Sequence, residues 1–129
     1  MKEEARVQAL GALYAADVLR QDVVDIDRLS ARAARLAEGT WQHREALDAR
    51  IGAASTGWRV ERMPAVDRTI LRLGAYELTQ TETPAAVVIS EAVQLAKQYS
   101  TARSGPFVNG VLATIASGGA TGAPDDPDV

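Results

Sequence analysis

Residues able to carry out catalysis are sparse in this 129-residue sequence. His43 is the only histidine, and there is no cysteine. Its neighbours Gln42, Arg44 and Glu45 are typical of a polar helix surface, and no serine or cysteine nucleophile accompanies them. Because catalysis requires several groups held in one constellation, we interpret His43 as a solvent-exposed helix residue and predict no catalytic site.

Metal-binding and phosphate-binding motifs are also missing from the sequence. No histidine and carboxylate have the i, i+4 spacing of metal ligands on a helix. Residues 118–122 are glycine-rich but lack the lysine and the strand–helix context of a phosphate loop. The acidic pairs Glu3 and Glu4, and Asp125 and Asp126, are adjacent and solvated, unlike an acid/base pair that flanks a substrate. We predict no metal, no cofactor and no enzymatic activity.

Two basic residues at the amino terminus have a spacing that suits nucleic acid. Lys2 and Arg6 lie one helical turn apart, so their side chains can meet successive phosphates. The alternative is that both charges only keep the first helix soluble. The spacing alone leaves both interpretations open.

The single phenylalanine, Phe107, stands in the first turn of the last predicted helix, beside Ser104 and Gly105. A helix amino terminus offers free N–H groups to phosphate, and an exposed aromatic ring stacks on an unpaired base. The alternative is that Phe107 packs on the core as a hydrophobic staple. Asn109 either donates to a base edge or bonds a neighbouring backbone group.

The composition is that of an ordinary globular chain, with 47% apolar and 24% charged residues and a net charge of −3. Three acids lie in the last five residues, and without them the 17 acidic residues become 14, which balance the 14 basic residues. A neutral domain binds nucleic acid only through a local patch. No apolar run is long enough to span a membrane, and the charged amino terminus does not resemble a signal peptide, so we expect a cytoplasmic location.

Apolar residues recur with helical spacing along the chain, and no stretch alternates with period two. The pattern predicts an all-α fold with helices over 3–20, 27–38, 40–58 and 63–78, a fifth opening at Pro84 and a sixth at Ser104. Gly39 is interpreted as a helix stop and Thr40 as the next N-cap. Trp58 and Tyr99 are predicted to face inward. Residues 1–116 form the predicted helical domain, and residues 117–129 a disordered acidic tail.

The helix over 63–78 is predicted to be the central one. Val66, Ile70 and Leu73 form one apolar stripe and Leu71, Gly74 and Leu78 the next, so this helix should contact neighbours on two sides. A glycine inside a helix costs about 1 kcal/mol relative to alanine. We therefore expect a second helix to approach closely at Gly74.

Three segments carry a family likeness. Residues 66–78 read VDRTILRLGAYEL, residues 89–97 read ISEAVQLAK, and residues 107–112 read FVNGVL. Together with the helix around residues 9–14, they resemble the NusB family of bacterial transcription antitermination factors. The resemblance covers residues 5–116.

This resemblance implies a fold of two small packed helical bundles, with about six to seven helices and no cofactor. It implies binding to the box A segment of ribosomal or phage leader RNA, jointly with a small-subunit ribosomal protein. It also implies a role with other antitermination factors on RNA polymerase. Position by position, the resemblance implies that basic residues of the first helix and the segment around Phe107 contact RNA. It also implies that one acidic residue faces the protein partner. The residues so assigned are Lys2, Arg6, Arg72, Arg103, Phe107 and, for the partner, Asp67.

The sequence departs from the family pattern at two places. Glu3 and Glu4 stand where arginines are usual, and Arg103 stands where the family commonly has an acidic residue. Each lost phosphate contact lowers the counterion-release contribution to RNA affinity. We expect RNA binding by the chain alone to be weaker than is typical, unless Arg103 or a partner protein compensates.

Two other functions stay open at this stage. One is a relative of the helical domain that precedes rRNA cytosine methyltransferases, which shares this fold but requires a fused catalytic domain with a cofactor-binding sheet. A paralogue that kept the scaffold and its protein partner but lost RNA binding is the other alternative, supported by Glu3 and Glu4. Monomer and homodimer are both open.

Overall fold

The computed structural model describes residues 2–118, and within them the chain forms six α-helices, one 3₁₀ helix and no strand. The elements are α1 (Lys2–Val18), α2 (Ala31–Gln42), α3 (Arg44–Ala54), η1 (Val60–Arg62), α4 (Ala65–Gln80), α5 (Ala85–Tyr99) and α6 (Ser104–Ala116). The predicted all-α fold is confirmed. The predicted disordered tail lies, from residue 119 onward, outside the described residues. None of the helices in the described range has the length and apolar content to cross a membrane.

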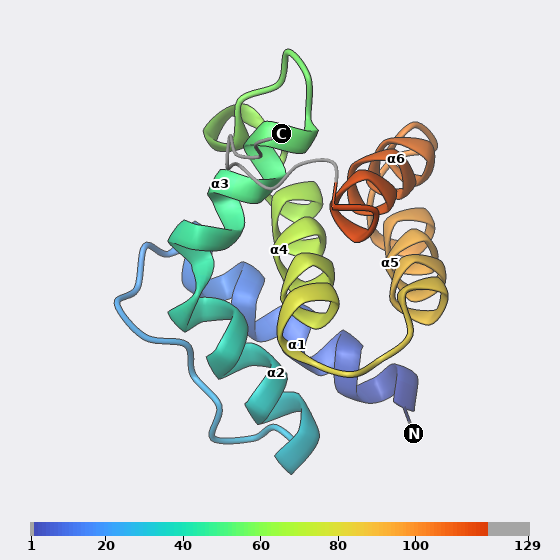
Figure 1. Ribbon diagram of the computed structural model, residues 1–129. Coiled ribbons are helices and arrows are strands. Elements are labelled where there is room, and N and C mark those ends of the chain that lie inside the picture. The colour runs from blue at the N-terminus through green and yellow to red at the C-terminus, as the bar shows by residue number, and fades with distance from the viewer. Residues whose placement is uncertain (1, 119–129) are drawn as a thin grey trace.

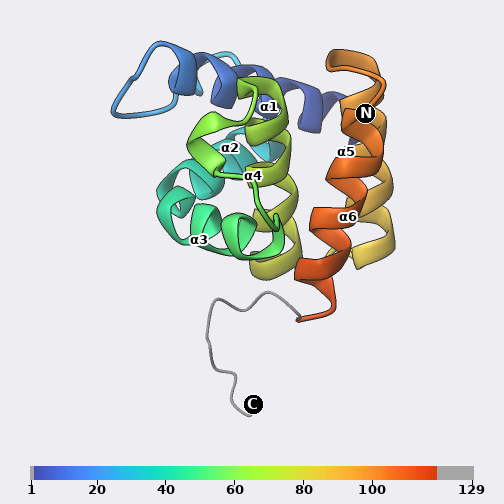
Figure 2. The same ribbon diagram turned by 90° about the horizontal axis from the view of Figure 1, so that it is seen from above.

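Helix α4 runs through the middle of the molecule. Figures 1 and 2 show α2 and α3 on one side of it and the antiparallel pair α5 and α6 on the other, with α1 crossing below α4 in Figure 1. Helix α4 contacts each of the other five α-helices. The sequence pattern predicted a central helix with neighbours on two sides, and the arrangement agrees with the two small bundles that the family resemblance implied.

The burial of α4 explains the two apolar stripes in its sequence. Ile70, Leu71 and Leu73 are each no more than 1% exposed, because helices cover α4 on both sides. Removing such a side chain from water contributes roughly 1.5–3 kcal/mol. Polar residues of α4 are buried as well, and these must find partners within the protein.

The close approach expected at Gly74 is confirmed. A Cβ atom at this position would lie 2.7 Å from Cδ1 of Leu112, a residue of α6 that is completely buried. Only glycine lets the Leu112 side chain settle directly on the α4 backbone. The contact offsets the low helix propensity of glycine and sets the distance between α4 and α6.

The predicted boundary between the second and third helices is wrong. Helix α2 begins after Ser30, whose Oγ accepts from the Ala33 N–H at 3.1 Å, and it continues through Gly39 to Gln42. A Cβ atom on Gly39 would lie 2.1 Å from the Tyr76 hydroxyl oxygen of α4. Gly39 therefore serves helix packing and does not stop the helix.

Two aromatic residues predicted to face inward are exposed instead. Helix α3 ends at Ala54, and Gly57 adopts a left-handed φ of +82°, so Trp58 lies in a connector and is 58% exposed. Tyr99, at the last position of α5, is 44% exposed. Helix α3 thus ends before Trp58, the last residue of its predicted stripe, whereas Tyr99 is within α5 but at its exposed end.

Candidate nucleic-acid interface

A pocket of about 250 Å³ opens between the connector after α3, the start of α4 and the turn that joins α5 to α6. It combines two aromatic rings, a cation and several polar groups. Its lining residues are Trp58, Met63, Pro64, Asp67, Thr101, Arg103, Ser104 and Phe107. We call it the aromatic pocket.

Phe107 is half-buried, and its ring packs against the hydrophobic core. The ring centroids of Phe107 and Trp58 are 5.9 Å apart at an interplanar angle of 61°, an edge-to-face contact. Such a pair contributes about 0.5–1.5 kcal/mol beyond the area it buries. Phe107 thus has a packing role and also lines an open surface pocket.

Arg103 and Asp67 are the two charged residues of the aromatic pocket, and their surroundings differ. Arg103 is exposed just before α6, and no ion pair in residues 2–118 involves it. Asp67 is 6% exposed, and its carboxylate accepts hydrogen bonds from the hydroxyls of Ser100 and Ser104. The expectation that Asp67 faces a partner protein does not match this placement, because the side chain instead ties α4 to the α5–α6 turn.

Arg6 is placed differently from the sequence expectation. Its guanidinium donates to both carboxylate oxygens of Glu77, with Nε–Oε2 at 2.9 Å and Nη2–Oε1 at 2.8 Å. Arg6 is only 4% exposed. The prediction that Arg6 presents its charge to a phosphate is therefore corrected, because a buried carboxylate from α4 holds that charge inside the fold.

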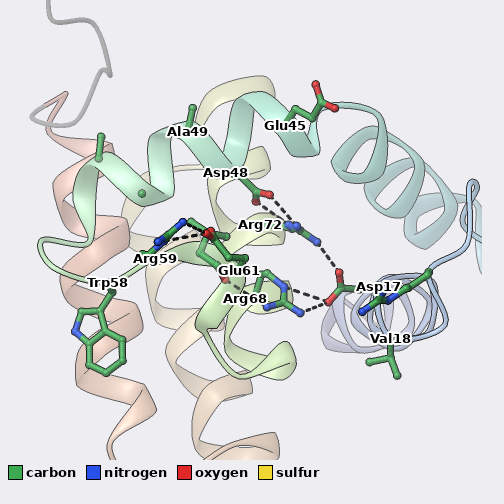
Figure 3. A pocket seen from close by; sticks show the side chains of 14 residues that line it. Asp17, Val18, Glu45, Asp48, Ala49, Trp58, Arg59, Glu61, Arg68 and Arg72 are labelled. Atoms are coloured by element: carbon green, nitrogen blue, oxygen red, sulfur yellow. Dashed lines mark hydrogen bonds and ion pairs between the residues drawn. The ribbon is translucent and has the colours of Figure 1, made fainter.

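Arg72 is corrected for the same reason. Its guanidinium makes two 2.7 Å bonds to Asp48 of α3 and one of 3.2 Å to Asp17 of α1 (Figure 3). Burial by itself lowers the pKa of Arg72, but the hydrogen bonds and charge of Asp48, and then of Asp17, outweigh it and raise the pKa above its ordinary value. Arg68 joins the network through Asp17 at 2.6 Å. These ion pairs join α1, α3 and α4, and the Arg72 side chain is only 11% exposed, so little of its guanidinium is presented to RNA.

The ion pairs line a larger groove, of about 900 Å³, shown in Figure 3. Its charged residues balance, since four acids face four arginines: Asp17, Glu45, Asp48 and Glu61 with Arg20, Arg59, Arg68 and Arg72. A surface without net charge does not attract a phosphate backbone. The groove is therefore a poor candidate for the nucleic-acid site despite its size.

The remaining predicted residues do not gather at one place. Asn109 is exposed and lines a separate groove between α5 and α6 with Lys97 and Pro106. The side chain of Lys2 lies outside the described residues. Arg6 of the first helix pairs with Glu77 near the end of α4, whereas Phe107 lines a pocket with Met63 and Asp67 at the start of α4, so the beginning of α1 does not share the surface of Phe107. Of the predicted RNA contacts, the structure brings together only Arg103 and Phe107.

His43 is exposed in the turn between α2 and α3, as the sequence suggested for a solvated position, with Nδ1 2.8 Å from the Gly39 carbonyl oxygen. No group of three or more potential metal ligands is present in the described part of the chain.

Trp58 is the aromatic pocket residue that sequence reasoning missed, because its spacing continued the stripe of the third helix. The residues Ser55, Thr56 and Gly57 immediately before it are typical turn formers. Reading them as the end of the helix would have placed Trp58 in a surface connector.

Comparison with known proteins gives a consistent picture. The model of the NusB family matches residues 3–117. The transcription antitermination protein NusB of Anaeromyxobacter dehalogenans is 43% identical over 129 residues, covering 91% of each chain. A solved structure of T. maritima NusB superposes with a TM-score of 0.80 at 30% identity, again covering 91% of each chain.

A further solved structure contains the antitermination factors NusB and NusE in complex with double-stranded RNA. It matches with a TM-score of 0.75 and 28% identity, over 91% of this chain and 96% of that one. The family model and the curated relative each span most of the chain. The chain therefore belongs to the NusB family of transcription antitermination factors, which are not enzymes.

Proposed function

We propose that this protein binds box A-type leader RNA of rRNA operons together with a small-subunit ribosomal protein, and helps assemble an antitermination complex with other factors on RNA polymerase. As part of this proposal, the protein is located in the cytoplasm. The observation that supports it most directly is the aromatic pocket, in which exposed Arg103 lies beside Phe107 and Trp58. The likeness to a NusB that was solved with NusE and RNA supports both partners.

The ribosomal protein has a specific task in this proposal. Arg6 and Arg72 are paired with Glu77, Asp48 and Asp17 inside the protein, so these two predicted RNA contacts are not presented to phosphates. Counterion release by Lys and Arg supplies most of the sequence-independent affinity for RNA. The chain alone should bind RNA weakly, and the partner should add the missing contacts.

A titration of fluorescently labelled box A RNA tests the proposal. The chain is titrated alone and with an equimolar small-subunit ribosomal protein, and a shuffled RNA of equal length serves as the control. We expect tighter binding with the partner than without it, and a preference for the box A sequence. Equal affinities in the two arms would contradict the joint-binding proposal.

The second candidate function is a protein-interaction scaffold that does not bind RNA. The burial of Arg6 and Arg72 and the presence of Glu3 and Glu4 favour it. In that case the ribosomal protein binds the chain in a pull-down, while box A RNA binds neither the chain nor the complex. Sedimentation of the same samples distinguishes a monomer from a homodimer.

A further inference from the structure

Trp58 carries an unusual amount of exposed aromatic surface for its size. It is 58% exposed, whereas the other tryptophan, Trp41, is 7% exposed and its Nε1 donates to the Asp22 carbonyl oxygen at 2.9 Å. Within residues 2–118 the indole N–H of Trp58 donates to no protein acceptor. Leaving a large apolar ring in water forgoes its burial energy, which is consistent with a ligand that covers the ring.

The Trp58 ring is nonetheless held in place. Phe107 contacts it edge-to-face at 5.9 Å, and the left-handed Gly57 orients the connector that carries it. In Figure 3 the indole points away from the ion pairs of the larger groove. An exposed ring with a supported orientation loses little conformational entropy when a flat partner stacks on it.

The groups around Trp58 indicate which partner fits. Exposed Arg103 supplies a cation, and exposed Thr101 lines the same pocket of about 250 Å³. The single acid there, Asp67, is 6% exposed and hydrogen-bonded to two serines, so little of its charge reaches a ligand. A flat ring joined to a phosphate matches this combination of an exposed aromatic face and a guanidinium.

We propose that Trp58 and Phe107 form the walls of a subsite for one unpaired RNA base, which stacks on the Trp58 indole while Arg103 contacts the neighbouring phosphate. The subsite rests on the proposed RNA-binding function and adds Trp58 to it. Bases in a duplex are already stacked on one another, so the subsite selects single-stranded RNA. Because stacking on an aromatic side chain changes affinity by about tenfold to hundredfold per base, its loss is measurable.

Fluorine NMR tests the subsite without altering the protein's core. The full chain is labelled with 5-fluorotryptophan, which gives one signal for Trp41 and one for Trp58, assigned with Trp58→Phe. The probe is box A-type RNA, added with the ribosomal protein present. We expect the Trp58 signal to shift and the buried Trp41 signal to stay unchanged. The same RNA annealed to its complement should shift the Trp58 signal far less.

Affinity measurements complete the test. Trp58→Ala should weaken RNA binding by about tenfold or more, whereas Trp58→Phe, which keeps an aromatic face, should lose much less. Tyr99→Ala removes another exposed aromatic side chain, 44% exposed and outside the pocket, and serves as the matched control, with affinity unchanged. Circular dichroism confirms that each variant is folded.

The outcomes separate this subsite from the proposed function. RNA binding without a Trp58 shift, or with Trp58→Ala as tight as the parent, overturns the subsite and leaves the function standing. Absence of RNA binding by the unaltered chain, with and without the ribosomal protein, overturns the function itself. A Trp58 shift caused by the ribosomal protein before RNA is added also overturns the subsite, since the pocket then receives a protein side chain.

Discussion

Arg6 of α1 and Glu77 of α4 form a buried ion pair across 71 residues of sequence. Two parallel hydrogen bonds of 2.9 and 2.8 Å join them, and their side chains are 5% and 2% exposed. Removing two charges from water costs free energy, and paired charge-assisted hydrogen bonds of this geometry offset that cost. The pair fixes where the start of α1 crosses α4, so a residue with an RNA-binding spacing has a structural role.

Arg6→Ala should lower the free energy of unfolding by about 3–5 kcal/mol, because it leaves the Glu77 carboxylate buried without this partner. Urea denaturation followed by circular dichroism measures the change. The exposed pair Arg59 and Glu61 offers the control, since Arg59→Ala should cost less than about 1 kcal/mol. The double variant Arg6→Met, Glu77→Leu should recover most of the lost stability. If Arg6→Ala is as mild as Arg59→Ala and mainly weakens RNA binding, the pair is not structural.

Gly74→Ala should destabilise the protein although alanine is the better helix former. The added Cβ would lie 2.7 Å from Cδ1 of fully buried Leu112, and overpacking of this kind costs roughly 1–3 kcal/mol. Gly110→Ala, at an exposed position of α6, is the matched control, because nothing lies within 4 Å of its added Cβ, and it should stabilise by about 0.5–1 kcal/mol. Thermal melts of both variants should therefore move in opposite directions. If the melting temperatures of both variants rose, the Leu112 side chain would be able to move aside at little energetic cost.

Asp67→Ala should lower stability by about 1–3 kcal/mol, since the hydroxyls of Ser100 and Ser104 lose their shared acceptor. Hydrogen exchange should accelerate in the turn between α5 and α6. Ser104→Ala is the companion variant and should reproduce a smaller part of both effects. An Asp67→Ala variant of unchanged stability that no longer binds the ribosomal protein would instead support the partner contact that the family resemblance implies.

The titration of Glu61 provides a pH-dependent prediction. A hydrogen bond from its own backbone and then the hydrogen bond and charge of Arg59 lower the pKa of Glu61 below its ordinary value of 4.5. Ionised Glu61 thus favours the folded state above pH 4.5, and this contribution is lost as the pH falls through the folded-state pKa. Arg59→Ala should raise the pKa only part of the way, because the backbone bond remains. Carboxyl ¹³C shifts measured against pH check this.

Arg62→Ala is the control for that titration, because its charge makes the smallest contribution to the Glu61 pKa. It should move the midpoint less than Arg59→Ala does. A larger effect from Arg62→Ala would show that the Arg59–Glu61 pair of 2.7 Å does not persist in solution.

Much of the fold was predictable because it depends on local periodicity. The apolar stripes of α4 identified it as the central helix, and Gly74 was correctly expected to mark a close helix approach. Helix ends were less predictable. Glycine is a typical helix-stop residue, yet Gly39 lies inside α2. The ring of Tyr76 from α4 occupies the space that a side chain at position 39 would fill.

The sequence by itself determined the helical architecture, the family likeness and the presence of cations and one phenylalanine with possible roles in RNA binding. Only the tertiary structure decided which of those side chains reach the surface. In the sequence Arg6 and Arg72 look like surface cations. In the structure they are buried, and they pair with Glu77 and Asp48 of other helices. Trp58 looks like a core residue, but the turn at Gly57 leaves it exposed. The physical reason is that spacing records the face of a helix, whereas exposure and charge pairing depend on what other segments place against that face.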